Sequence, residues 1–201
     1  MTAAATQGQR TDTRTAILDT AEELVQVRGF NAFSYADVSS ELDITNAALH
    51  YHFPGKAELG HALITRYAER FAGSLQRIEA SDDTPYDRLQ AYADLYRGVL
   101  EADRMCLCGM LAAEYQTLPD TMRDAVVAFF DANHVWLTRV LEAGRDDGTI
   151  RLAGRASDAA ELIVGTLEGA LLVARTYGHP SRFQAVSEQL LAEFKGEQAP
   201  S

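Results

Sequence analysis

Apolar residues recur at helical spacing along nearly the whole chain. Over residues 13–28 they fall at positions i, i+1, i+4, i+7 and i+8, and Gly29 follows as a C-terminal cap. No stretch alternates apolar and polar residues over more than a few positions, so the pattern predicts helices and no sheet. The inward residues of this first helix are expected to be Ile17, Leu18, Ala21, Leu24 and Val25.

Prolines and capping residues mark the limits of further helices. Ser34, with Asp37 three residues later, predicts the start of a short second helix, and Thr45 caps a third that ends at Pro54. Together with the six helices that follow, these predict an all-α fold of nine helices. The six are expected over residues 56–80, 85–102, 106–116, 119–145, 156–177 and 180–194.

The composition is that of a folded protein with a hydrophobic core. Of the 201 residues 47% are hydrophobic, which lies well outside the range of disordered chains. The longest apolar run, residues 162–174, is interrupted by Glu168 and falls short of the about 18 residues that span a bilayer. Residues 1–14 lack the apolar block of a secretory signal. We therefore expect no membrane span and a cytoplasmic location.

Acidic residues outnumber basic ones in both halves of the chain. There are 18 Lys and Arg against 29 Asp and Glu, a formal net charge of −11. Residues 1–70 carry 6 basic and 9 acidic side chains, and residues 71–201 carry 12 and 20. This excludes a protein that coats nucleic acid through bulk positive charge. It leaves room for a selective reader, because binding depends on the charge at the contact face.

The second and third predicted helices lie in a distinctive stretch of sequence. Gly29-Phe30 and Asp37-Val38 precede the run ITNAALHYHFPGKAEL, which begins at Ile44. Two short helices joined by a tight turn and preceded by a longer helix are the parts of a helix-turn-helix DNA reader. On these residues, positions 14–63 resemble the N-terminal domain of the tetracycline-repressor (TetR) family of transcriptional regulators.

The resemblance implies a nine-helix TetR-like fold in four segments. They are an arm that we expect to be disordered (residues 1–12), a helix-turn-helix domain (13–55), a ligand-binding and dimerisation domain (56–195) and a tail (196–201). It also implies a homodimer that pairs through the last two long helices, binds a palindromic double-stranded operator and is released by a small-molecule effector. A repressor is the first interpretation, and an activator of the same family is the alternative.

Carried over position by position, the resemblance implies the DNA-contacting residues. Leu49 and Phe53 would anchor the third helix, and Thr45 would lie at its N-terminus, where free N–H groups favour anions. Asp43 stands where the family has Gly in the turn, which Asp tolerates by adopting a left-handed conformation. His50 and Asn46 replace the usual Tyr and Lys, so the operator sequence stays open. The DNA contacts implied are Ser34, Tyr35, Thr45, Asn46, Ala47, His50, Tyr51, His52 and Lys56.

Two apolar stripes and a set of aromatic and polar residues describe the second domain. The stripes, at 162–174 and 183–194, exceed what one small domain needs, and we interpret them as the dimer interface. Their members are Leu162, Ile163, Thr166, Leu167, Ala170, Leu171, Ala174, Phe183, Val186, Leu190, Leu191 and Phe194. The alternative for each pocket candidate is plain core packing. The ligand-binding candidates are Tyr92, Tyr96, Cys106, Met110, Tyr115, Phe130, His134, Trp136 and Glu168.

The two cysteines, Cys106 and Cys108, lie too close in a helix to bridge each other. The segment CLCGMLAAE around them is similar to the segment around the sensing cysteine of an electrophile-responsive TetR-type repressor. One hypothesis is that Cys106 is a thiol sensor, whose pKa a helix start would lower. The alternative is a small buried residue, because buried cysteines are usually inert.

No motif in the sequence supports catalysis. There is no GxSxG elbow, phosphate loop or dinucleotide fingerprint, so we expect neither an enzyme nor a cofactor. Glu58-x-x-His61 and Asp131-x-x-His134 mimic the motifs of di-metal carboxylate bundles. Such sites need Glu in both motifs and two further bridging carboxylates, so this alternative is weak and we expect no metal.

Overall fold

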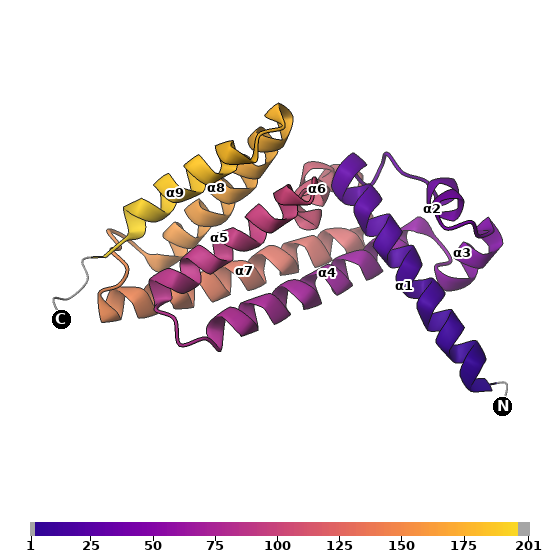
Figure 1. Ribbon diagram of the computed structural model, residues 1–201, viewed down its shortest axis with the longest axis horizontal. Helices are drawn as coiled ribbons and strands as arrows, with labels where there is room; N and C mark the ends of the chain where they lie inside the picture. Colours follow the sequence, from indigo (N-terminus) through magenta and orange to yellow (C-terminus); the bar gives the residue numbers. More distant parts are fainter. Residues whose placement is uncertain (1–2, 197–201) are drawn as a thin grey trace. The chain divides into compact units, whose positions relative to one another are not determined.

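The computed structural model describes residues 3–196, with side chains from Asp12 onward. This part of the chain forms nine α-helices and one short 3-10 helix, and it contains no strand (Figure 1). None of these helices is both long and apolar enough to cross a membrane. The elements are α1 (Ala3–Arg28), α2 (Tyr35–Glu41), α3 (Asn46–His52), α4 (Lys56–Glu79), α5 (Pro85–Glu101), α6 (Leu107–Ala113), η1 (Tyr115–Thr117), α7 (Asp120–Asp147), α8 (Ala156–Tyr177) and α9 (Pro180–Phe194).

The all-α prediction is confirmed, and two elements differ from it. Helix α1 begins at Ala3, so residues 3–12 of the predicted arm are helical, since Ala, Gln and Arg favour a helix and no proline interrupts them. The predicted helix over 106–116 is divided into α6 and η1, because the chain tightens at Glu114, whose N–H bonds the carbonyl of Leu111. Residues 1–2 and 197–201, from the predicted arm and tail, lie outside the described residues.

The helices form two compact units, which are described separately. Unit 1 comprises the chain up to Ala68 together with Leu107–Val126, and unit 2 comprises Glu69–Cys106 and the chain from Val127 onward. Helices α4 and α7 contribute residues to both units. Unit 1 therefore includes α6 and η1 as well as the predicted helix-turn-helix.

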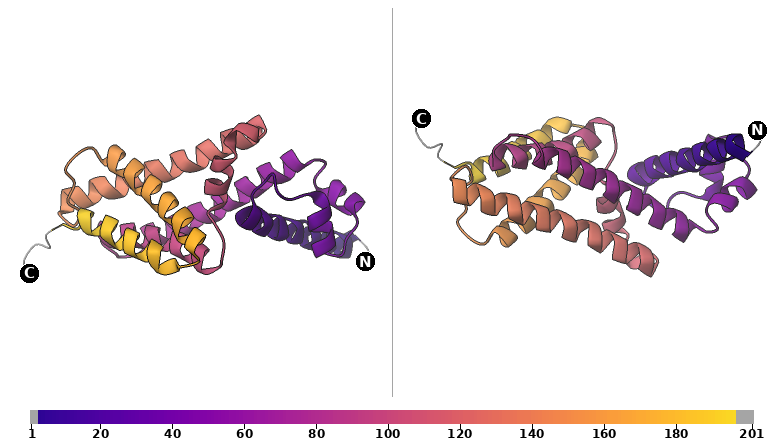
Figure 2. Two further views of the ribbon diagram at one scale, coloured as in Figure 1. Left: turned by 90° about the horizontal axis from the view of Figure 1, so that it is seen from above. Right: turned by 90° about the horizontal axis from the view of Figure 1, so that it is seen from below.

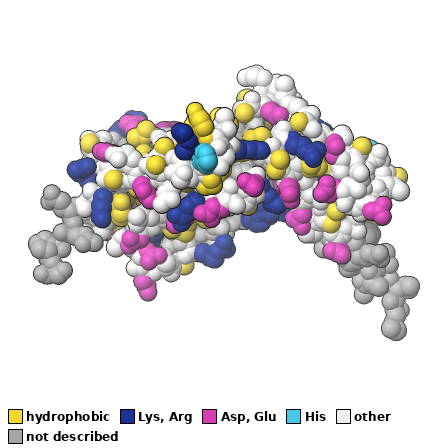
Figure 3. Space-filling model, turned by 45° about the horizontal axis from the view of Figure 1, so that its top comes forward, with side chains coloured by type: hydrophobic (Ala, Val, Ile, Leu, Met, Phe, Trp, Pro, Cys, Tyr) yellow, Lys and Arg dark blue, Asp and Glu magenta, His cyan; other side chains and the backbone are white. Residues whose placement is uncertain are grey.

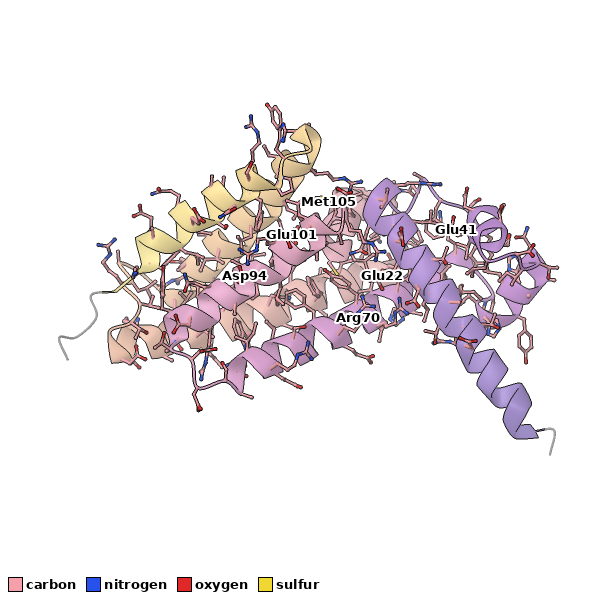
Figure 4. The ribbon with its side chains drawn as sticks, in the orientation of Figure 1. Glu22, Glu41, Arg70, Asp94, Glu101 and Met105 are labelled. Atoms are coloured by element: carbon pink, nitrogen blue, oxygen red, sulfur yellow. The ribbon has the colours of Figure 1, made fainter. Side chains whose placement is uncertain are left out.

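Unit 1 is built around α1. This helix lies against α2 and α6, and α2 lies against α3 (Figure 2). All five predicted inward residues of α1 are buried, as are Val38, Leu49 and Phe53. Glu22 of α1, labelled in Figure 4, is also buried, and it accepts a hydrogen bond of 2.8 Å from Arg66 of α4. The helix-turn-helix thus packs on a buried apolar core.

Unit 2 has its helices α5, α8 and α9 packed together (Figure 1). A tight turn at Gly178 joins α8 to α9, and this residue takes the left-handed conformation (φ 64°) that glycine adopts without strain. Asp94 and Glu101 of α5, labelled in Figure 4, both pair with Arg97 on the exposed side of that helix. The inner side of α5 supplies Leu89, Tyr92, Tyr96 and Leu100 to the core.

Most residues of the two predicted dimer stripes are buried within unit 2. One face of α8 and one face of α9 lie in the core of the protomer. Both helices have more than one apolar face, and the helical period does not indicate which of them packs in the core. The prediction that these particular residues form the dimer interface is therefore wrong for the buried ones. They are Ile163, Leu167, Ala170, Leu171, Ala174, Phe183, Leu190, Leu191 and Phe194.

A different set of apolar residues remains exposed on α8 and α9. Leu162 is 56% exposed, and Val186 is exposed as well. The others, which were not predicted, are Leu172, Val173 and Tyr177.

Candidate functional site

Helix α2 begins with the predicted cap. The Ser34 hydroxyl accepts from the Asp37 N–H at 3.4 Å, and the Asp37 carboxylate accepts from the Ser34 N–H at 2.7 Å. The Ser34 hydroxyl also donates to this carboxylate at 2.6 Å, and chiefly this bond lowers the pKa of Asp37. The capping box fixes where α2 starts, and the exposed Ser34 side chain is part of it.

The turn between α2 and α3 is held by one backbone conformation and one side-chain bond. Asp43 has φ 51°, so the left-handed conformation expected for it is confirmed. The Ser39 hydroxyl donates to Oδ1 of Asn46 at 2.7 Å. Because Oδ1 is engaged in this way, Asn46 presents its NH₂ group as the free half of its amide.

Helix α3 turns one face inward and leaves the other exposed. Leu49 and Phe53 are buried, as predicted, and the Thr45 hydroxyl caps the helix by accepting from the Ala48 N–H at 3.1 Å. Tyr51 is 64% exposed, with its ring edge-on to His52 at 5.4 Å between centroids. The exposed residues of this segment are Thr45, Asn46, Ala47, His50 and Tyr51.

Tyr35 and His50 brace the end of α3. The Tyr35 hydroxyl donates to the Phe53 carbonyl at 3.0 Å, and burial raises its pKa to about 12. His50 Nδ1 lies 3.1 Å from the Pro54 carbonyl, so this nitrogen carries a proton and Nε2 faces outward as the remaining polar atom. The ring centroids of Tyr35 and His50 lie 4.8 Å apart. The hydroxyl of Tyr35 is thus engaged within unit 1.

Lys56, at the start of α4, holds the α1–α2 loop (residues 29–34). Its ammonium donates to the carbonyls of Phe30 and Phe33, both at 2.5 Å, and lies 4.6 Å and 4.4 Å from their ring centroids. Burial lowers the pKa of this ammonium, and the nearby carboxylates of Glu114 and Asp37 oppose that effect. The family resemblance implies a DNA contact by Lys56, but its ammonium is engaged with the loop.

Glu114 holds the same loop, although no pattern in the sequence indicated a role for it. Its carboxylate accepts from the N–H groups of Phe30 at 2.7 Å and Asn31 at 3.2 Å, and the Asn31 amide donates to the Thr117 hydroxyl at 2.7 Å. At Gly29, which has φ 93°, a Cβ atom would lie 2.6 Å from the Glu114 carboxylate. Phe30 and Glu114 are 84 positions apart, and no local pattern signals such a pair.

Arg14 is a second cation near α3, and it is not among the predicted DNA contacts. Arg14 of α1 is exposed, and its guanidinium lies 5.0 Å from the ring centroid of Phe53, at the end of α3. The face shown in Figure 3 carries basic and acidic side chains interspersed, without a continuous patch of one sign. Arg14 is therefore a candidate cation for a DNA contact by unit 1.

Unit 2 contains a buried polar cluster, which consists of Tyr92, Tyr96, Cys106, Asn133, Trp136 and Glu168. The Tyr92 hydroxyl lies 3.1 Å from that of Tyr96 and donates to Oδ1 of Asn133 at 3.0 Å. The ring of Trp136 stacks on that of Tyr92, with centroids 5.7 Å apart. Trp136 is only 4% exposed, yet its Nε1 has no hydrogen-bond partner within the described part of the chain.

Glu168 is the one carboxylate of this cluster. It accepts a hydrogen bond from the Cys106 thiol, while its Oε1 is buried and has no hydrogen-bond partner among residues 3–196. Burial raises its pKa to about 7, and the pKa values of Tyr92 and Tyr96 are also raised by burial. Cys106 follows Met105, labelled in Figure 4, in the loop between α5 and α6, and it is 1% exposed.

The structure brings together part of the predicted ligand-binding set. Tyr92, Tyr96, Cys106, Trp136 and Glu168 all belong to the cluster of unit 2. The remaining candidates lie elsewhere. Met110 and Tyr115 belong to unit 1, Phe130 is partly exposed on α7, and His134 Nε2 lies 3.1 Å from the Ser157 carbonyl.

The described residues provide no metal centre. No group of three or more His, Cys, Asp or Glu side chains in this part of the chain could hold a metal ion. A di-metal site needs more ligands than the two motifs supply, so that alternative is not supported.

Comparisons with known proteins match both units. Residues 17–63 match the family described as "Bacterial regulatory proteins, tetR family", and residues 85–190 match "Tetracyclin repressor-like, C-terminal domain". The crystal structure of a TetR-family regulator from Agrobacterium tumefaciens is 34% identical in sequence, with a TM-score of 0.90 over 93% of this chain and 100% of that one. A TetR regulator from Legionella pneumophila is 32% identical, with a TM-score of 0.81 over 90% and 96%.

The similarity extends to a curated repressor. The HTH-type transcriptional repressor NemR of Escherichia coli (strain K12) is 25% identical over 171 residues, which are 82% of this chain and 84% of NemR. The resemblance seen in the sequence is therefore confirmed over both the N-terminal and the C-terminal parts of the chain.

Proposed function

Because the chain belongs to the TetR family of bacterial transcriptional regulators, we propose that it is a homodimeric repressor released from a palindromic operator by a small molecule. The observation that carries this proposal is the exposed face of α3. Leu49 and Phe53 anchor the helix on its buried side, while Tyr51 and its neighbours stay exposed. An activator would bind DNA through the same helix, so the proposal of repression rests on the similarity to NemR. The protein would act in the cytoplasm, where its operator lies.

We propose that α3 reads bases in the major groove. The exposed face of this helix carries Asn46, Ala47, His50 and Tyr51, and the exposed Thr45 caps its N-terminus. A recognition helix approaches base edges with such a face. Since Asn46 presents its NH₂ group, we expect it to favour base acceptors such as guanine O6 and N7 or thymine O4. The small side chain of Ala47 permits a close approach of the backbone.

Phosphate contacts would flank this helix. Ser34 and Tyr35 lie at the start of α2, and His52 is the last residue of α3. Tyr35 would act by placing α2, since its hydroxyl is engaged. Lys56 would contribute through the N-terminus of α4 rather than through its ammonium. Arg14 is the exposed cation beside α3, and we add it to the proposed phosphate contacts.

We propose that α8 and α9 form the dimer interface through the residues that the protomer leaves exposed. Leu162 and Val173 of α8 lie on one side of the helix. Gly165 and Gly169 are exposed on that side too, with no atom within 4 Å of an added Cβ. Small residues in such an arrangement let two helices approach closely. This supports pairing with the same helix of a second protomer.

The buried polar cluster of unit 2 is the proposed effector site. An effector releases the operator only if it binds the DNA-bound state less tightly, and operator DNA must then weaken effector binding by the same factor. The resemblance around Cys106 keeps a second route open, in which an electrophile modifies this thiol. Since Cys106 is buried, the reagent reaches it only when the α5–α6 loop opens. If Cys106→Ser is released from DNA by electrophiles at wild-type doses, this route is wrong.

The substitution Tyr51→Ala tests the reading helix. We expect it to weaken binding to a selected operator about tenfold or more, because one aromatic contact at the groove is lost while the fold is kept. Fluorescence anisotropy with labelled operator duplex measures the affinity, and size-exclusion chromatography checks the dimer. Arg14→Ala should weaken binding to all sequences alike and flatten its salt dependence.

Arg145→Ala, which removes an exposed arginine of unit 2, serves as the matched control. Operator affinity that is unchanged in both Tyr51→Ala and Arg14→Ala would contradict the assignment of α3 as the DNA reader.

A further inference from the structure

The buried polar cluster of unit 2 suits one chemical class of ligand. We propose that it binds a small organic cation that also carries a hydrogen-bond acceptor, such as a quaternary ammonium alcohol. This names the class of the effector and so rests on the proposed function. Three features carry it, namely the carboxylate of Glu168, the aromatic rings around Tyr92 and the unpaired N–H of Trp136.

A positively charged partner would stabilise the carboxylate of Glu168. Its Oε1 has no hydrogen-bond partner within residues 3–196, and its neighbour Cys106 contributes a thiol and no positive charge. No Lys, Arg or His of the described residues forms an ion pair with it. A buried carboxylate is costly when ionised and unpaired, and a bound cation would remove that cost. An anionic ligand would be repelled.

Aromatic rings surround this region of unit 2. The ring of Trp136 stacks on that of Tyr92, and Phe71 lies edge-on to Tyr92 and Tyr96 with centroids 6.0 Å and 6.2 Å away. Trp and Tyr rings attract cations through their negative faces, most strongly where water is excluded. A carboxylate among Trp and Tyr rings is therefore suited to a cation with an apolar surface, such as a methylated ammonium, rather than to a strongly hydrated metal ion.

The indole N–H of Trp136 specifies the rest of the ligand. The hydroxyl of Tyr92 is already bonded to Asn133, and the Asn133 amide donates to the Phe129 carbonyl at 2.8 Å. Nε1 of Trp136 is the donor of this cluster that has no partner in the described part of the chain. A ligand hydroxyl or carbonyl would accept from it. A ligand that carries both a positive centre and an acceptor would supply a partner for each of these two atoms.

Cation binding should depend on pH with a defined sign. The groups that face Glu168 are Tyr92 and Tyr96 from α5 and Cys106 from the α5–α6 loop. The pKa values of both tyrosines are raised, so neither ionises near neutrality, whereas the pKa of Glu168 is about 7. Affinity for the cation should therefore rise as the pH passes from 6 to 8, and binding near pH 7 should release a proton.

The test compares cations with neutral molecules of the same shape. The probes are choline, acetylcholine and benzyltrimethylammonium, each paired with the analogue in which carbon replaces the ammonium nitrogen. Trp136 is the single tryptophan of the chain, so its fluorescence reports directly on the cluster, and calorimetry in buffers of different ionisation enthalpy counts the protons released. We expect at least one cation to bind about tenfold or more tightly than its neutral analogue.

Two variants keep the test decisive. Glu168→Gln preserves the shape of the side chain and should abolish both the preference for the cation and its pH dependence. Trp136→Phe keeps an aromatic ring but removes the single tryptophan, so calorimetry follows its binding. It should weaken binding of the cations while leaving their pH dependence. The inference is overturned if no cation binds, if the neutral analogues bind equally well, or if Glu168→Gln binds cations as the wild type does.

The same preparation separates this inference from the function on which it rests. Wild-type protein that binds its operator but responds to none of the cations overturns the ligand class alone. Wild-type protein that binds no DNA sequence selectively overturns the proposed function, whatever the cations do.

Discussion

Asp37 and Glu168 show how surroundings set the behaviour of one chemical group. Asp37 accepts hydrogen bonds at the exposed start of α2, and these lower its pKa. Glu168 is partly exposed as a residue and lies near Tyr92 and Tyr96, and burial of its carboxylate raises its pKa to about 7. The first carboxylate is charged at neutral pH and holds a helix start, whereas the second is divided between charged and neutral forms and is poised to respond to a ligand.

The raised pKa of Glu168 predicts a pH dependence of stability. Between its usual value of 4.5 and about 7, the folded state keeps a proton that the unfolded chain has lost. The free energy of unfolding therefore falls as pH rises through this window, and Glu168→Gln should lack this fall. We expect the variant to gain on the wild type by roughly 2 kcal/mol between pH 4.5 and 7.5, as measured by urea unfolding. Parallel curves for the two proteins would contradict the assignment.

The sequence predicts which side chains of a helix face inward, but it does not predict which groups they bond to. The helical period of the segment places Leu49 and Phe53 inside and Tyr51 outside, and the structure confirms this. The helical period does not reveal the partners of the Lys56 ammonium. They are backbone carbonyls of a loop that lies 26 and 23 positions earlier. In α7 Val135 is exposed, while its neighbour Trp136 is buried.

At the scale of elements, the α1–α2 loop is held by two side chains. Lys56 of α4 binds its carbonyls, and Glu114, which follows α6, binds its N–H groups. The loop directly precedes α2, so its conformation fixes where the helix-turn-helix starts. Both contacts lie within unit 1.

Removal of the carboxylate at position 114 should loosen this loop. Glu114→Ala leaves the N–H groups of Phe30 and Asn31 without their protein acceptor, so we expect the free energy of unfolding to fall by about 1 kcal/mol. Operator affinity should also fall several-fold, as measured by anisotropy. Glu142→Ala, at an exposed glutamate of α7, is the matched control. Wild-type stability and affinity in Glu114→Ala would show that the loop does not need this carboxylate.

The helices themselves follow from local sequence to different degrees. Helices α8 and α9 begin and end where the sequence predicts, because Pro180 and Gly178 interrupt the pattern sharply. The segment after Cys106 gives no such signal, and its division into α6 and η1 depends on where Glu114 finds its partners. Which apolar face of α8 turns inward is likewise decided by packing against α5 and α9.

At the scale of the whole molecule, the dimer should depend on the exposed face of α8. Val173→Glu places a charge among the apolar residues of that face and should dissociate the protein into monomers. Val135→Glu makes the same change at an equally exposed valine of α7 and should leave the dimer intact. Light scattering after size-exclusion chromatography measures the mass. A Val173→Glu protein that stays dimeric would place the interface elsewhere.

The net charge of −11 argues against general binding of nucleic acid and for selective DNA binding. Because acidic residues outnumber basic ones, non-specific binding at physiological salt should be weak, and affinity should depend on base contacts.

Selection of binding sites from random-sequence DNA duplexes by the whole chain tests whether α3 reads a palindromic operator. A dimer that reads DNA through α3 should enrich a palindrome whose half-sites are about 34 Å apart or a near multiple of that distance. Tyr51→Ala should enrich the palindrome weakly or not at all. Enrichment of no sequence, or of a single half-site without a symmetric partner, would contradict the account.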